Sequence, residues 1–179
     1  MNLPCLEFIN SQWHDKRHAF SDPLLEQDWL AAFCQRWELP FPADASDRLM
    51  RLRSLLSQAA HEFCASGTLA CATLDELNAY LRPVTLHIEL APQTDAFGSL
   101  LRERLAGEAV NVFACELVRS LARLIGGPGG RKLKCCSNPD CGWFYYDSSR
   151  NGTRKWCDNT CASLIKVRKF REAGKRSGQ

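Results

Sequence analysis

Four cysteines near the C-terminal end constrain this chain more than any other feature. They form two close pairs, Cys136-x4-Cys141 and Cys157-x3-Cys161, with fifteen residues between the pairs. Two thiolates from each tight turn can meet around one tetrahedral Zn²⁺ at about 2.3 Å, which leaves no open position for a water molecule. The spacing therefore predicts one structural zinc ion per chain.

The alternative is a set of free or disulfide-bonded cysteines. Disulfides need an oxidising compartment, and nothing in the sequence indicates one. Residues 1–11 contain Glu7 and lack the basic leader of a secretory signal. The sequence contains no run of about 18 apolar residues, so it predicts no membrane-spanning helix. We therefore expect a cytoplasmic protein without a membrane segment.

The residues between the two cysteine pairs predict a small β-element. The aromatic run Trp143 to Tyr146 favours a short strand. Asp147 to Gly152 has the composition of a turn, and Arg154 to Trp156 is a candidate for the return strand.

The second cysteine pair falls at the start of a predicted helix. This helix is expected to run to about Ala173, with Gly174 as its stop. The first turn of a helix favours negative charge, which suits thiolate ligands. Knuckle, hairpin and ligand-bearing helix together predict a treble-clef-like finger. We expect Leu164, Val167 and Phe170 to hold the helix against its own domain.

This part of the chain resembles the CGNR-type zinc finger, which forms the C-terminal part of bacterial proteins with an N-terminal ABATE domain. The segments that carry the resemblance are Lys132 to Lys134, Cys141 to Asn151 and Arg154 to Cys157, and more weakly Leu3 to Ser11. The family is regarded as stress-induced transcriptional regulators. The resemblance implies that Cys136, through its x4 spacing, is a ligand and that Cys135 is not.

One segment departs from the family pattern. Ala162-Ser163-Leu164 follows the last cysteine, where the family has Gly-Asn-Arg. Zinc binding does not depend on this segment because the four cysteines are intact. If the finger binds DNA, this departure predicts weaker or altered recognition compared with relatives that keep Gly-Asn-Arg.

Charge is distributed unequally along the chain. Residues 131–179 contain 12 Lys and Arg against 4 Asp and Glu, a net charge of +8, whereas residues 1–130 contain 11 against 16, a net charge of −5. An acidic body with a basic tail suggests that the tail meets a polyanion. The alternative is a charged helix that serves only solubility.

Apolar periodicity predicts a mainly helical body before the finger. Asp22-Pro23 should begin a helix that runs to about Trp37, and a second helix should begin near Asp44 or Ser46 and end at Gly67. Thr73-x-x-Glu76 has the pattern of a capping box for a third helix.

The last part of the body is expected to contain one strand and one long helix. Residues 84–90 alternate between apolar and polar side chains, which predicts a half-buried strand whose partner lies in 94–97 or near the N-terminus. Residues 100–125 are expected to form the longest helix. The fold class is thus mainly α with a small β component.

Glycines mark the predicted domain boundary. Gly126 to Gly130 contains four glycines and a proline, which cannot continue a helix. We expect a helical ABATE-like domain at 1–125, a linker at 126–130 and a CGNR-type finger with a basic helix at 131–179.

The favoured function is a zinc-finger regulator that binds double-stranded DNA. Cations on the hairpin and on the helix are the candidate DNA contacts: Arg150, Arg154, Lys155, Lys166, Arg168, Lys169 and Arg171. The N-terminal domain would bind a small-molecule effector or a protein partner. Formation of an oligomer is a further possibility that the sequence leaves open.

Two other classes of function are the alternatives to a DNA-binding regulator. One is a zinc-stabilised protein-interaction module without DNA binding, because fold alone does not determine function. The other is an enzyme, which we do not expect, since a closed four-cysteine site cannot activate water and no motif marks a nucleophile or base.

Overall fold

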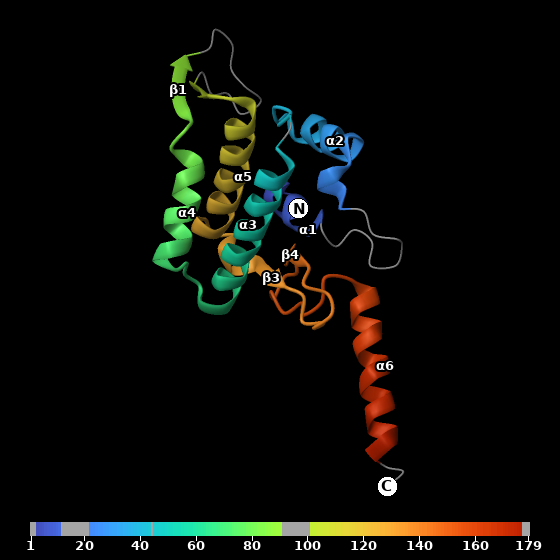
Figure 1. Ribbon diagram of the computed structural model, residues 1–179. Helices are drawn as coiled ribbons and strands as arrows, with labels where there is room; N and C mark the ends of the chain where they lie inside the picture. Colours follow the sequence, from blue (N-terminus) through green and yellow to red (C-terminus); the bar gives the residue numbers. More distant parts are fainter. Residues whose placement is uncertain (1–2, 12–21, 44, 91–100, 177–179) are drawn as a thin grey trace.

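The computed structural model describes residues 3–11, 22–43, 45–90 and 101–176, with side chains up to residue 171 (Figure 1). Its α-helices are α1 (Pro4–Asn10), α2 (Gln27–Trp37), α3 (Ser46–Ser66), α4 (Cys71–Leu81), α5 (Ala109–Gly126) and α6 (Asn159–Arg176). Its strands are β1 (Thr85–Leu90), β2 (Leu101–Ala106), β3 (Leu133–Cys135) and β4 (Phe144–Tyr146). Two short 3₁₀-helices occupy Pro23–Leu25 and Gly130–Lys132. The mainly helical fold class with a small β component is confirmed.

The core of the body lies around α5, which contacts α1, α3 and α4 (Figure 1). Phe8 of α1, Phe33 of α2 and Phe113 of α5 meet there, with ring centroids 5.7 to 6.0 Å apart. Tilted and edge-on aromatic pairs at this distance contribute more than their buried area alone. Helices from both ends of the body sequence therefore share one core.

The predicted helix starts and stops are partly confirmed. Asp22 accepts a hydrogen bond from the Leu24 backbone N–H, but it caps the 3₁₀-helix, and α2 begins only at Gln27. Arg53 of α3 reaches the same carboxylate, and its hydrogen bonds keep the pKa of Asp22 below the usual range. Gly67 ends α3 with a φ of 77°, a conformation that favours glycine.

The predicted capping box at Thr73 is wrong. The helix α4 begins two residues earlier, at Cys71, and Thr73 lies buried inside it. The Thr73 hydroxyl donates to the Glu62 carboxylate of α3 at 2.8 Å. Its side chain therefore joins two helices instead of capping one.

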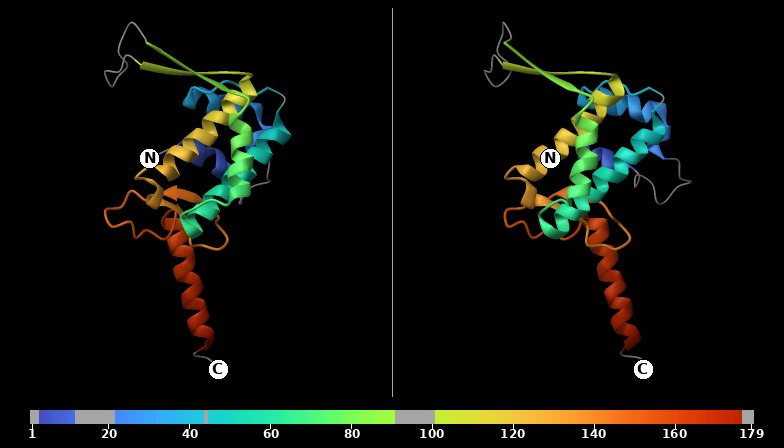
Figure 2. Two further views of the ribbon diagram at one scale, coloured as in Figure 1. Left: turned by 90° about the vertical axis from the view of Figure 1, so that its left-hand side faces the viewer. Right: turned by 60° about the vertical axis from the view of Figure 1, so that its left-hand side comes forward.

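The strand prediction for residues 84–90 is correct in type but wrong in environment and partner. β1 pairs antiparallel with β2, and Leu86 lies opposite Leu105. The long helix expected from residue 100 therefore starts only at Ala109. All six residues of β1 are exposed, because the two strands project from the body as an arm (Figure 2). Residues 94–97, the other candidate partner, lie outside the described residues.

Gly126 to Gly130 does not separate two cores. Gly130 is buried, and a β-carbon there would lie 2.4 Å from the Ile125 carbonyl oxygen. Leu133 of β3 and Phe144 of β4 belong to the same hydrophobic core as the helices of the body. A linker at 126–130 implies separate cores for the two domains, and this implication is wrong for β3 and β4, which enter the core of the body. The boundaries 1–125, 126–130 and 131–179 stay a prediction.

Candidate metal centre

The structure brings together Cys136, Cys141, Cys157 and Cys161. Their four Sγ atoms all lie within 4.8 Å of one another. The distance is 3.6 Å from Cys141 to Cys157 and 3.7 Å from Cys157 to Cys161. Sulfurs bound to one tetrahedral zinc ion at the usual bond length lie about 3.8 Å apart. The donor set and its spacing fit a structural Zn²⁺.

A knuckle after β3 presents the first pair. The Cys136 N–H donates to the Trp143 carbonyl at 2.8 Å, and the Cys141 N–H donates to the Asn138 carbonyl at 2.9 Å. Gly142 follows with a φ of 67°, which lets the chain reverse into β4. Both thiols of the pair are thereby turned to the same side.

The start of α6 presents the second pair. Asp158 accepts a hydrogen bond from the Cys161 N–H at 2.8 Å, as an N-cap residue does. The Cys157 N–H points to the Cys136 sulfur at 3.4 Å, and the Asn138 side chain donates to the Cys161 sulfur at 3.4 Å. These donors stabilise negative thiolates. The predicted stop at Gly174 is wrong, because α6 continues to Arg176.

The predicted return strand at 154–156 is also wrong. β4 pairs with β3, so the sheet forms with residues before the first ligand. A buried carboxylate closes the loop after β4 instead of a strand. Asp147 is fully buried and accepts hydrogen bonds from the Ser149 N–H and hydroxyl and from the Arg154 N–H. The hydrogen bond from the Ser149 hydroxyl lowers the pKa of Asp147 most. Burial raises this pKa, but the backbone donors lower it further, and the net result is a pKa below the usual value.

Sequence reasoning assigned Asp147 only to a turn and missed its role as the loop's central acceptor. An Asp-x-Ser pattern directly after a strand is the available signal, because such an aspartate bonds to the backbone two residues further on.

Tyr145 and Arg154 fasten the loop to the zinc-binding residues. The Tyr145 hydroxyl donates to the Arg154 carbonyl at 2.7 Å, and burial raises the pKa of Tyr145 to about 12. The Arg154 guanidinium lies 5.0 Å from the centre of the Tyr145 ring, and its Nε donates to the Trp156 carbonyl at 2.7 Å. Arg154, a candidate DNA contact, therefore also supports the finger itself.

The finger is joined to the body through β4. The Asn10 side chain donates to the Phe144 carbonyl at 2.8 Å and accepts from the Phe144 N–H at 2.9 Å. This paired contact imitates a neighbouring strand. His61 of α3 packs against Phe144 with ring centroids 4.6 Å apart. Both contacts hold the finger in a defined place on the body.

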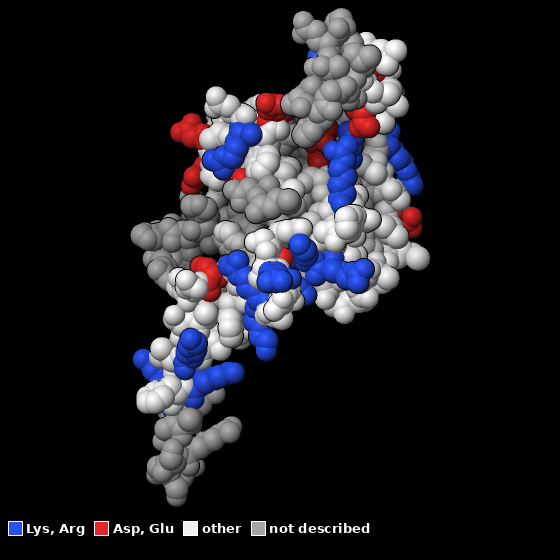
Figure 3. Space-filling view, turned by 180° about the vertical axis from the view of Figure 1, so that it is seen from behind, with Lys and Arg blue, Asp and Glu red and all other residues white. Residues whose placement is uncertain are grey.

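The candidate DNA contacts are all exposed, on the finger loop and on α6: Arg150, Arg154, Lys155, Lys166, Arg168, Lys169 and Arg171. Lys and Arg side chains gather over the lower part of the molecule, including α6 (Figure 3). Of the seven, Arg168 forms an ion pair with Asp140 of the knuckle. None of the described helices has the length and apolar character needed to cross a bilayer.

The apolar residues of α6 do not hold it to the finger, contrary to expectation. Leu164, Val167 and Phe170 are exposed, and Phe170 retains 81% of its accessible surface. The helix points away from the body (Figures 1 and 2). Its position is set at its first turn, where Asp158 caps it and Cys161 joins the metal cluster.

Fold and site together define a zinc-finger protein with a helical N-terminal part. The ABATE family model, described as "Putative stress-induced transcription regulator", matches residues 2–128, and the model described as CGNR zinc finger matches residues 132–173. The first covers well over half of the chain, which therefore belongs to the ABATE family. No curated protein matches the chain.

A pair of substitutions tests the choice between the adjacent thiols. Cys136→Ser is expected to remove zinc, because Cys136 belongs to the sulfur cluster and Cys135 does not. Cys135→Ser is the matched control and should retain about one zinc per chain. Metal analysis of the two purified variants decides the assignment. Equal loss of zinc in both, or loss only from Cys135→Ser, would overturn it.

Proposed function

We propose that the finger and α6 bind double-stranded DNA and that the protein is a transcription regulator working in the cytoplasm. The observation that carries the proposal is the exposed basic helix, which no other described element covers along its length. Lys166, Lys169 and Arg171 on α6 have no acidic partner among the described side chains and present their charges to solvent. Phosphates supply most of the sequence-independent affinity to such a surface.

The zinc has a structural role in this proposal. Four thiolates fill its coordination shell, so it cannot bind and activate a water molecule. It fixes the direction of α6 relative to the finger loop, and thereby places the cations of both segments on one connected surface. We assign the protein no enzymatic activity.

Neutralising three cations of α6 tests the proposal. Arg168→Gln/Lys169→Gln/Arg171→Gln should bind duplex DNA of any sequence roughly tenfold or more weakly at low salt. If all three side chains contact phosphates, the slope of log K against log salt falls by about 2.7. Arg168 is already paired with Asp140, so the loss of its charge should contribute less to this change than the loss of the other two charges. Fluorescence anisotropy of labelled duplexes at several salt concentrations measures both quantities.

A matched control separates local contact from total charge. Arg82→Gln/Arg102→Gln/Arg104→Gln removes the same charge from exposed positions beside and on the β1–β2 arm. It should bind DNA as the parent does. Absence of DNA affinity in the parent at low salt, or equal affinity of the two triple variants, would count against DNA binding.

The exposed apolar residues of α6 favour the second candidate function. Val167 and Phe170 offer a partner protein an apolar contact along the helix. If the protein fails to bind DNA, a zinc-stabilised protein-interaction module becomes the better proposal. Binding of a partner protein would depend on the Phe170 side chain, and it would change only weakly with salt concentration.

A further inference from the structure

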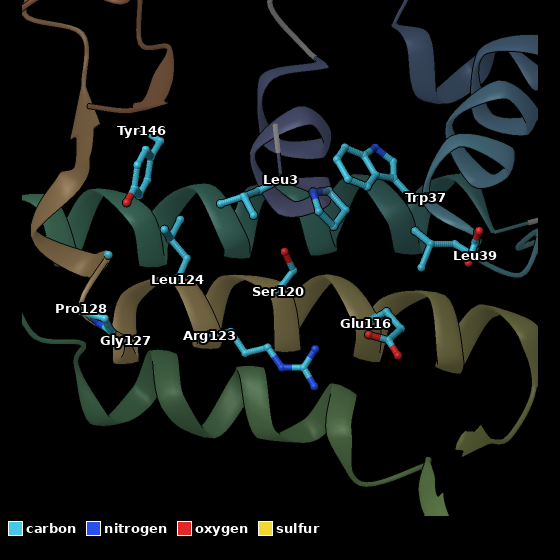
Figure 4. A pocket seen from close by; sticks show the side chains of 13 residues that line it. Leu3, Trp37, Leu39, Glu116, Ser120, Arg123, Leu124, Gly127, Pro128 and Tyr146 are labelled. Carbon is cyan, nitrogen blue, oxygen red and sulfur yellow. The ribbon is translucent and has the colours of Figure 1, made fainter. Parts of the chain in front are cut away.

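A cavity of about 620 Å³ lies where the helical body meets the finger (Figure 4). Its wall includes Leu3 before α1, Trp37 and Leu39 at the end of α2, and Tyr146 of β4. Segments far apart in the sequence therefore meet around one space. Its volume is in the range of pockets that bind small organic molecules.

The interior of this cavity is mainly apolar. Ser120 and Leu124 point from α5 toward Leu3 and Tyr146 (Figure 4). Two aromatic rings, those of Trp37 and Tyr146, form part of the wall. Such a lining suits an apolar or aromatic ligand body.

The charged groups of the wall leave a negative charge without a counter-ion. Arg123 points away from Leu3 and Tyr146, and its guanidinium lies 3.4 Å from Glu103 (Figure 4). Glu116 is paired with Arg119 at 3.3 Å. The carboxylate of Glu38 has no hydrogen bond or ion pair within the described part of the chain. A ligand would therefore meet one unpaired carboxylate, at the Glu38 end of the cavity.

The backbone conformation of Glu38 is also unusual. Glu38 has a φ of 53°, the one described residue other than glycine with a positive φ. It ends α2 in a left-handed conformation for which glycine is preferred. A glutamate at a position suited to glycine places a carboxylate at the cavity.

We propose that this cavity binds an amphipathic organic cation, with an apolar or aromatic body and one ammonium-like charge. The body of the ligand fills the space between α5, Leu3 and Leu39. The charge lies by the Glu38 carboxylate at the Trp37 and Leu39 end of the cavity, where the face of an aromatic ring also attracts cations.

Such a ligand would touch the body and the finger at once. Gly129 adjoins Tyr146, and a β-carbon on this glycine would lie 3.3 Å from the tyrosine ring. A ligand that prefers one arrangement of these segments stabilises that arrangement. The regulatory consequence rests on the proposed DNA binding, whereas binding of the cation does not.

Isothermal titration calorimetry of the full chain without DNA tests the proposal. The probes are tetraphenylphosphonium and tetraphenylborate, which have similar shapes and opposite charges. We expect one phosphonium per chain and at least tenfold weaker binding of the borate, although the chain's net charge of +3 would favour the anion. Equal affinity for both probes, or no phosphonium binding, would overturn the proposal.

Substitutions locate the site. Glu38→Gln should weaken phosphonium binding about fivefold, as expected for loss of one exposed charge contact. Glu38→Gly removes the same charge and suits the backbone, so it should weaken binding equally. Glu89→Gln, on the exposed β1 strand, is the control and should bind as the parent does. Parent-like affinity in both Glu38 variants would refute this site, whether or not the protein binds DNA.

Discussion

Removal of zinc is expected to unfold the residues from Asp147 to the end of α6 and to leave α3 and α5 folded. Apart from the sulfur atoms, the small core around the metal site consists of Tyr145 and the half-buried Trp143 and Trp156. So small a core cannot offset the entropy of ordering the loops. Zinc binding contributes on the order of 10 kcal/mol to the folding of comparable fingers.

Hydrogen exchange resolved by peptide measures this effect. After chelation, or in Cys161→Ser, amides of residues 147–171 should lose protection, while those of α3 and α5 keep it. Cys71→Ser, at an exposed cysteine of α4, is the control and should exchange like the parent. Retained protection in α6 after complete loss of zinc would contradict a folding role for the metal.

Phe144→Ala is expected to destabilise the whole chain by about 3–5 kcal/mol. Phe144 is a finger residue, but it is 1% exposed and lies in the core of the body. The substitution leaves a cavity beside His61 and weakens the strand-like contact with Asn10. A loss of this size is a large part of the stability of an ordinary domain.

Urea unfolding followed by circular dichroism measures the change, because helices of the body dominate that signal. Phe170→Ala removes an identical side chain from an exposed position of α6 and should change the stability of the body little. If Phe144→Ala leaves the unfolding midpoint of the body unchanged, the finger and the body unfold independently.

Local sequence patterns predicted several features of the structure correctly. The spacing of four cysteines predicted the cluster, since each pair is formed by a turn of a few residues. Gly67 marked the end of α3, because a left-handed residue at that place favours glycine. The aromatic run before Asp147 became β4, as β-propensity predicts.

Other features depended on neighbours that no local pattern reveals. Leu101 and Leu105 fit a helical spacing as well as a strand, and only pairing with β1 decided for the strand. The same holds for β4, whose partner is β3 and not residues 154–156.

The sequence by itself determined the four-cysteine cluster, most helices and the division of charge, because these depend on residue types at short spacing. Tertiary structure alone decided that Phe144 enters the core of the body and that Phe170 stays exposed, although both are apolar residues of one finger. Burial depends on what lies beside a side chain in space. Phe144 meets α1 and α3, whereas Phe170 lies on a helix that leaves the body.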